Sequence, residues 1–309
     1  MKKVSRIASL LLFALAVSSH SLCAQQKPIP RTFVAGSEER YQVTVIIRVE
    51  THGISTEKIG GKTYATPFTH EANGQLSWRS TRKISSLNAD GSAAIVETLD
   101  HFQNNCGQDR NAKNFDPGLQ KSVQETCAGW QNLSQMNYEE EKLGLIRGLP
   151  VLTNQLTNLD SSLLTLWIRH SFRPAVLLPK TPVQFGKRTD RAVANTSGVE
   201  ASPKGQESSE WLEASSDPPA ATLHVSQDLR WTDAPLRSGF SNVGGTPARG
   251  QLFYADSLNT ISLLDGSLLK ASRSASRETK EVLDPVPGLP DAPTFGSKLT
   301  ITVTMLRLP

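Results

Sequence analysis

Residues 298–305, with the sequence KLTITVTM, decide the fold expected of this chain. Their Leu, Ile, Val and Met residues alternate with Lys and Thr, and successive side chains of a β-strand point to opposite faces. The stretch therefore predicts a strand with one apolar face and one hydroxyl-rich face. Residues 41–49, YQVTVIIRV, repeat the alternation far from this stretch and predict a second long strand.

Turn sequences separate the strand-like segments. Asp265-Gly266 lies between two apolar runs, and Asn88-Ala89-Asp90-Gly91 lies between two further strand-like runs. Asp, Asn and Gly tolerate the backbone conformations that tight hairpin turns require. Each turn predicts a β-hairpin, and strands with one polar and one apolar face favour an antiparallel sheet. The Gly- and Pro-containing residues 54–69 are expected to form a loop or a short irregular hairpin.

Two helices are predicted to cover this sheet. Asp116-Pro117 offers an N-cap followed by proline at the first helical position. The apolar residues that follow share one helical face: Leu119, Val123, Cys127 and Trp130. A second helix is expected over residues 160–170. The predicted fold class is therefore α+β, a long antiparallel twisted sheet that could curve like a half-barrel and is covered by two helices.

The first 24 residues have the pattern of a secretory signal peptide. Three cations precede a short apolar run, and small residues follow before Ala24, where cleavage is expected. The pattern predicts a protein that is exported to the periplasm or secreted and that is not an integral membrane protein after cleavage. Lipoprotein anchoring through Cys23 is the alternative, but Leu22 stands where a small residue is preferred.

Composition divides the remaining chain. Residues 25–186 form the expected N-terminal β-rich part with both helices, and residues 222–309 form the C-terminal part that completes the sheet. Ser, Pro, Gly, Glu and Lys dominate residues 187–221, which predicts a mobile loop or linker. Loss of the three signal-peptide cations lowers the formal net charge from +4 to +1 (4 − 3). So small a charge argues against a nucleic-acid partner.

Two cysteines follow the cleavage site, Cys106 and Cys127. An even pair in an exported chain predicts a disulfide, here one that ties the first helix to the preceding strand. Free buried thiols are the alternative. Two cysteines without neighbouring histidines cannot complete a zinc site, and neither a metal nor a cofactor is predicted.

No catalytic or ligand-binding constellation can be assigned from the sequence. Ser-x-x-Lys occurs three times, but the strand-like setting of two copies would point the two side chains to opposite faces. The histidines that follow the signal peptide are scattered: His52, His70, His101, His170 and His224. A hydrolase site assembled from distant His, Ser and Asp residues remains an alternative.

Three segments resemble uncharacterised exported bacterial proteins with a signal peptide and a long antiparallel sheet. These segments are residues 88–91 (NADG), 178–186 (LPKTPVQFG) and 264–271 (LDGSLLKA). The resemblance implies bacterial export and a β-rich fold. It implies no activity and supplies no functional residues.

The sequence favours an exported, non-enzymatic envelope protein that binds a partner protein or an apolar ligand against the aliphatic face of its sheet. A secreted hydrolase and a purely structural surface protein are the two alternatives.

Overall fold

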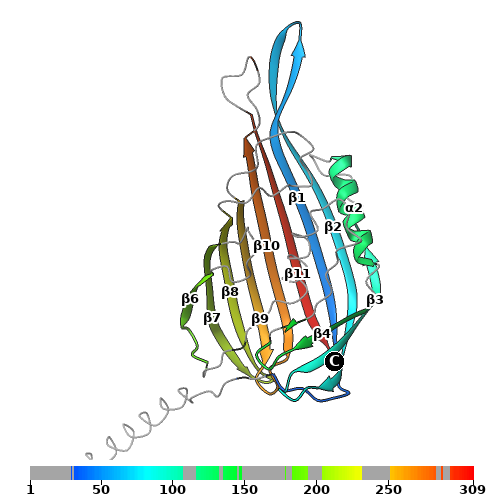
Figure 1. Cartoon of the computed structure of the whole chain (residues 1–309), viewed down its shortest axis with the longest axis vertical. Helices are drawn as coiled ribbons and strands as arrows, with labels where there is room; N and C mark the ends of the chain where they lie inside the picture. Colours follow the sequence, from blue (N-terminus) through cyan, green and yellow to red (C-terminus); the bar gives the residue numbers. More distant parts are fainter. Residues whose placement is uncertain are drawn as a thin grey trace, which may run out of the picture.

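A computed structural model shows a single curved sheet (Figure 1). It describes residues 29, 31–106, 116–131, 135–144, 146–147, 178, 183–193, 204–231, 251–282, 287 and 293–309. The 11-stranded sheet is antiparallel, with the order β5-β4-β3-β2-β1-β11-β10-β9-β8-β7-β6. Its strands are β1 (Glu38–Ile59), β2 (Lys62–Leu87), β3 (Ala93–Asn104), β4 (Gln135–Glu140), β5 (Ile146–Arg147), β6 (Arg188–Val193), β7 (Lys204–Ser216), β8 (Pro219–Trp231), β9 (Gln251–Ser262), β10 (Leu268–Val282) and β11 (Thr294–Leu308).

The two clearest alternations in the sequence lie side by side at the centre of the sheet. β1 contains residues 41–49 and β11 contains residues 298–305, so both predicted strands are confirmed. Their register pairs Val45 with Val303 and Ile47 with Ile301, and all four side chains are buried on the inner face. The two predicted hairpin turns are also confirmed, because residues 88–92 join β2 to β3 and residues 263–267 join β9 to β10.

The predicted α+β fold class is wrong. The described residues form an almost entirely β structure, with the single helix α2 (Pro117–Gln131). The N-cap was predicted well, since Asp116 Oδ1 accepts a hydrogen bond from Leu119 N at 2.7 Å. The second predicted helix, residues 160–170, lies outside the described residues.

Strands also occupy residues 54–69, where a loop or a short irregular hairpin is expected, and residues 187–221, where a mobile loop or linker is expected. Residues 54–69 form the far end of the continuous β1–β2 hairpin. In place of the expected linker, β6, β7 and the start of β8 lie within residues 187–221. Most side chains in both segments are partly or fully exposed, so these strands lack the buried face that gives an apolar alternation. The parts on either side of the expected linker consequently belong to one sheet.

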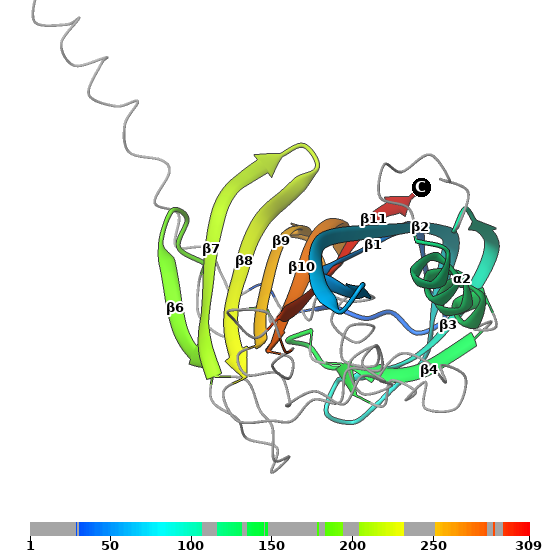
Figure 2. The ribbon, with the colours of Figure 1, turned by 90° about the horizontal axis from the view of Figure 1, so that it is seen from above.

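Seen from above, β1–β4 curl around α2 and form a first wing, whereas β6–β10 form a second wing (Figure 2). The helix lies against the inner face of β2. A Cβ atom on Gly74 would lie only 2.7 Å from both Cys106 Sγ and Val123 Cγ1, so the bare glycine permits this close contact. Gln120 Nε2 also donates to the Asn73 carbonyl at 3.1 Å. Among the described residues, no helix is long and apolar enough to cross a bilayer.

Candidate functional site

Segments that are distant in sequence meet at one end of the sheet, which we call the base (the lower end in Figure 1). The chain before β1 crosses it. Arg31 N donates to the Lys142 carbonyl at 2.7 Å, and Thr32 N donates to the Asp265 carbonyl at 2.8 Å. Lys142 follows β4 in the first wing and Asp265 precedes β10 in the second. The crossing segment therefore ties the two wings together.

Two turns at the base contain the same tripeptide, Asp-Gly-Ser. Asp90 Oδ1 accepts hydrogen bonds from the Ser92 amide at 2.9 Å and the Ser92 hydroxyl at 2.7 Å. Asp265 Oδ1 accepts the same pair from Ser267, at 3.0 and 2.7 Å. The glycines between them have φ values of 79° and 68°, a region that glycine enters without strain. The same local chemistry thus closes a hairpin in each wing.

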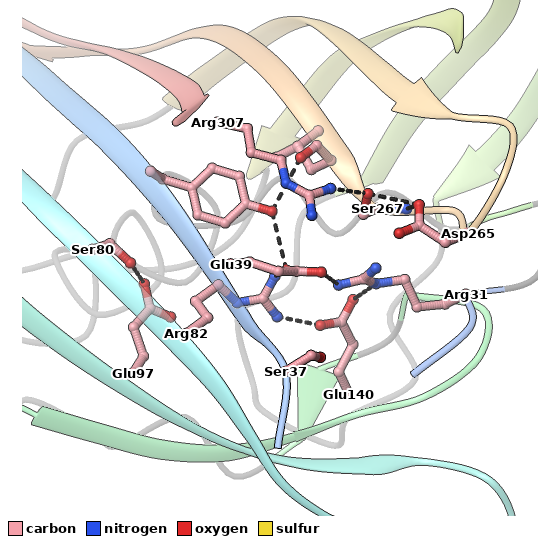
Figure 3. Close-up of polar contacts among 12 residues, drawn as sticks. Arg31, Ser37, Glu39, Ser80, Arg82, Glu97, Glu140, Asp265, Ser267 and Arg307 are labelled. Carbon is pink, nitrogen blue, oxygen red and sulfur yellow. Dashed lines mark hydrogen bonds and ion pairs between the residues drawn. The ribbon is translucent and has the colours of Figure 1, made fainter. Parts of the chain in front are cut away.

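A buried network of four charges lies inside the base (Figure 3). Arg31 donates from Nη2 to Glu39 Oε1 at 2.5 Å and from Nε to Glu140 Oε1 at 3.2 Å. Arg82 donates from Nη1 to Glu39 Oε2 at 2.9 Å and from Nη2 to Glu140 Oε2. Each carboxylate oxygen therefore accepts from one guanidinium group. Since no side chain of the four exceeds 9% exposure, the pairs lie in a medium where charge attraction is strong.

Neutral groups extend this network toward a third carboxyl group. Arg82 Nε donates to the Tyr138 hydroxyl at 2.9 Å, and that hydroxyl donates to Glu97 Oε2 at 2.7 Å. The Ser80 hydroxyl donates to Glu97 Oε1. On the opposite side, the Tyr41 hydroxyl lies 3.0 Å from the Leu268 carbonyl of β10. The network accordingly connects β1, β2, β3 and β4 with the second wing.

The two signs of charge stabilise one another in the network. Burial opposes ionisation of Glu39, but the guanidinium groups of Arg82 and Arg31 outweigh it and hold the pKa of this carboxyl below its ordinary value. Burial likewise opposes the charge of Arg31, yet Glu140 and Glu39 raise the pKa of its guanidinium. The pKa of Arg82 is also raised, because Tyr138, Glu140, Tyr41 and Glu39 outweigh the effect of burial. All three groups are consequently charged at neutral pH.

A small cavity of about 50 Å³ lies against the network, between the two wings. Its polar side is formed by Arg31, Tyr41, Arg82 and Glu140. Its other side is apolar apart from backbone and is formed by Gly144, Ile146, Leu178, Ile261, Gly266, Leu268 and Met305. The volume suits a few water molecules or a small apolar group, and it is well below the several hundred Å³ of a drug-sized pocket.

The geometry favours binding and structural roles over proton transfer. A lowered pKa and a guanidinium at each oxygen keep Glu39 ionised, whereas a general base works best with a pKa near the operating pH. No group of three or more His, Cys, Asp or Glu side chains within the described ranges could hold a metal ion.

A disulfide joins the predicted cysteine pair near the end of the first wing that lies opposite the base. Cys106 follows β3 and Cys127 lies in α2, and their Sγ atoms are bonded with a Cα–Cα distance of 6.5 Å. The disulfide fixes α2 against the sheet and lies apart from the base. Cys23 lies outside the described residues.

The histidines do not assemble a hydrolase site in the part of the chain that the structure describes. His224 Nε2 lies 2.7 Å from Asp256 Oδ2, and His70 Nδ1 lies 3.2 Å from Asp116 Oδ2. Among the described residues, no hydrogen bond joins either histidine to a serine, and neither histidine lines the base cavity. His170 lies outside the described residues. In two of the three Ser-x-x-Lys motifs, which begin at Ser80 and Ser267, the serine hydroxyl donates to a carboxylate instead, Ser80 to Glu97 and Ser267 to Asp265.

The residues of the base network are not among the predicted site residues, although the sequences of the strands carry a signal for them. Glu39 has the same parity in β1 as the buried Tyr41 and Val43, so it must point inward. Arg82 in β2 and Glu97 in β3 likewise occupy inward positions where an apolar residue is the norm. Charged residues of both signs at inward positions of neighbouring strands indicate a buried ion network.

Neither a protein-family model nor a curated protein sequence matches this chain. Among solved structures, one described as lipid–protein interactions in lipovitellin has 10% identity and a TM-score of 0.42, and the match covers 90% of this chain and 25% of that one. The outer membrane protein OprG from Pseudomonas aeruginosa has 8% identity and a TM-score of 0.21, covering 90% of this chain and 98% of that one. The InvG secretin β-barrel from the Salmonella SPI-1 injectisome has 9% identity and a TM-score of 0.15, covering 97% of this chain and 67% of that one. This chain therefore spans a quarter of the lipovitellin chain, and similarities this low carry no argument about function.

Proposed function

We propose that this chain is an exported, non-enzymatic binding protein that holds one end of an apolar ligand in the base cavity. The proposal rests on the base cavity. One side of this cavity is apolar, and the charged groups on its other side are already paired within the base network. Two arginines and two glutamates neutralise each other there, so a charged ligand would find no unmatched partner among them. An apolar group would instead gain contact with Ile261, Leu268 and Met305.

The small volume narrows the ligand class. About 50 Å³ cannot enclose a whole lipid, but it can receive the end of an alkyl chain whose remainder lies elsewhere. Export is supported by the N-terminal signal-peptide pattern and by the Cys106–Cys127 disulfide, since disulfides persist in oxidising compartments.

The first test combines extraction with a direct binding measurement. Organic extraction of the purified protein followed by mass spectrometry should release a long-chain molecule. Titration with cis-parinaric acid, whose fluorescence rises in apolar surroundings, should show saturable binding. Ile261→Phe should lower the affinity at least about ten-fold, because the larger ring fills the space that the chain end requires.

Leu258→Phe provides the matched control, since Leu258 lies in the same strand but is 44% exposed on the outer face. It should bind the probe as the unmodified protein does. Overpacking at position 261 can itself cost about 1–3 kcal/mol of stability, so thermal melting must first show that the variant is folded. A folded Ile261→Phe protein with unchanged affinity, or an unmodified protein that binds no probe, would rule out the base cavity as the ligand site.

A further inference from the structure

The β1–β2 hairpin extends beyond the rest of the sheet, at the end opposite the base (Figure 1). β11 pairs with β1 as far as Gly53, opposite Phe295, and β3 pairs with β2 only from Leu76 onward. From residue 54 to residue 69, the two strands therefore pair only with each other among the described strands. Two-stranded ribbons are marginally stable in water, so a ribbon of this length benefits from a surface to rest on.

One face of the ribbon carries exposed apolar side chains up to its tip. The register pairs Glu57 with Tyr64 and Ile59 with Lys62, which places Ile59 and Tyr64 on the same face. Ile59 is 56% exposed and Tyr64 is 51% exposed. Nearer the sheet, Phe68 of the same face packs 6.4 Å from the ring of Phe295. The apolar stripe is thus covered where it leaves the sheet and uncovered at the tip.

Lysines flank the turn at the tip, in the sequence KIGGK of residues 58–62. Lys62 lies on the face of Ile59 and Tyr64, and Lys58 lies on the opposite face. Both lysine side chains are exposed. The exposed Glu57 opposite Tyr64 leaves residues 57–64 with a formal charge of +1 (two lysines minus one glutamate).

The ribbon makes one hydrogen bond to another segment near its tip, from Thr63 Oγ1 to the Pro287 carbonyl at 3.0 Å. Lysines on the strands of the ribbon oppose pairing with a further strand, which argues against a partner that adds to the sheet. Lysine beside tyrosine and an aliphatic residue is instead the combination that favours the interface of an anionic bilayer.

We infer that the tip of this hairpin docks on an anionic phospholipid bilayer. Ile59 and Tyr64 enter the headgroup region, while Lys58 and Lys62 contact lipid phosphates. Gly60 and Gly61 have positive φ values of 58° and 82° and form a turn without bulk at the leading edge. The inference does not rest on the proposed ligand, although a docked tip would turn the end of the sheet opposite the base toward the membrane.

Flotation with lipid vesicles tests the inference on the purified protein, after mass spectrometry has established its N-terminus. The protein should bind vesicles of phosphatidylcholine with phosphatidylglycerol and should not bind vesicles of phosphatidylcholine alone. The double variant Lys58→Gln/Lys62→Gln should lose roughly thirty-fold in affinity, since each lysine near an anionic surface contributes a factor of about five. Ile59→Ser/Tyr64→Ser should also lose at least about ten-fold, because it removes the groups that enter the interface.

Matched changes on the outer face of the sheet, Lys270→Gln and Leu258→Ser, should leave vesicle binding unchanged, because both residues are exposed but far from the tip. A photo-reactive benzoyl-phenylalanine in place of Ile59 should crosslink to lipid in cells. The inference fails if neither vesicle composition is bound, if tip variants bind as well as the controls, or if the crosslinker captures a protein instead. Probe binding in the base cavity is measured separately, so either proposal can fail while the other stands.

Discussion

The two wings of the sheet share the same type of hairpin turn at the base but differ in the side chains on their inner faces. Each wing has an Asp-Gly-Ser hairpin turn at the base. The first wing turns large side chains inward, among them Tyr41, Trp78 and Ile95. Along most of β9 and β10 the second wing instead turns small or polar residues inward: Ala255, Ser257, Asn259, Ala271, Arg273 and Ala275. Its larger buried side chains form a separate cluster that includes Trp211, Leu223 and Ile261. Local turn chemistry therefore does not determine how a sheet builds its core.

Each wing also buries an arginine, and the comparison between them is informative. Arg82 and Arg273 are 5% and 6% exposed. For Arg82 the surrounding groups outweigh burial and raise the pKa, whereas for Arg273 burial outweighs the attraction of Glu207 and lowers the pKa to about 10. Arg273 still carries its charge at neutral pH. Of these two buried arginines, Arg82 is therefore stabilised on balance by its neighbours, whereas Arg273 is not.

The largest effect is expected from Arg82→Met, which would leave Glu39 and Glu140 buried with one cation between them. Breaking a buried pair in this way costs about 3–5 kcal/mol, a large part of the stability of a typical domain. Arg273→Met should cost less than about 1 kcal/mol, because the charge it removes is disfavoured by burial. Urea unfolding of both variants measures the difference, with the exposed Lys83→Ala as control. If Arg82→Met and Arg273→Met lowered the free energy of unfolding equally, the proposed difference between the two buried arginines would be wrong.

A smaller effect is expected from Gly74→Ala in the first wing. The new methyl group would meet Cys106 Sγ and Val123 Cγ1, so α2 must shift from the inner face of β2. Overpacking of this kind costs about 1–3 kcal/mol. Ser77→Ala, three residues along the same strand and on its outer face, should change the free energy of unfolding by less than about 0.5 kcal/mol. Faster amide exchange in α2 of the Gly74→Ala protein would locate the disturbance, and unchanged exchange there would contradict this account of the contact.

The smallest change is expected on mild acidification. The pKa of Glu39 lies below its ordinary value of 4.5 in the folded protein, so its ionised form favours folding above pH 4.5. This contribution is lost as the pH falls below 4.5 through the folded pKa. Thermal melting between pH 7 and pH 3 should show the loss, and Glu39→Gln should show a shallower dependence on pH. Glu38→Gln, a change of the exposed neighbour, is the control, and an identical slope for Glu39→Gln would exclude the network as its source.

Residue patterns within a single segment of sequence predict the strands that bury one face and the turns that join strands. Residues 41–49 and 298–305 alternate because one side of each strand is buried, and both Asp-Gly turns form within a few residues. β6, β7 and the hairpin tip could not be predicted in this way, since their side chains are mostly exposed on both faces. These segments form strands because their backbones hydrogen-bond to neighbouring strands, and no pattern within one segment indicates that pairing.

The base network was harder to predict because its members meet only through the register of the whole sheet. Arg31 and Glu140 are 109 residues apart, and Arg82 and Glu140 are 58 apart. The inward position of each charged residue could have been inferred from strand parity. The pairing of each glutamate with each arginine could not be inferred, because β3 lies between β2 and β4 in the sheet.

The pairing of β1 with β11 has a consequence for the order in which the protein can be built. β1 is made before β11, and its hydrogen-bonded neighbour on one side from Arg40 to Gly53 is supplied by residues 295–308, far later in the chain. Until β11 is made, one edge of β1 has no native neighbour, and such edges readily pair with other chains. Among the described strands, the middle of the sheet is therefore completed last, after β2–β10 have been made.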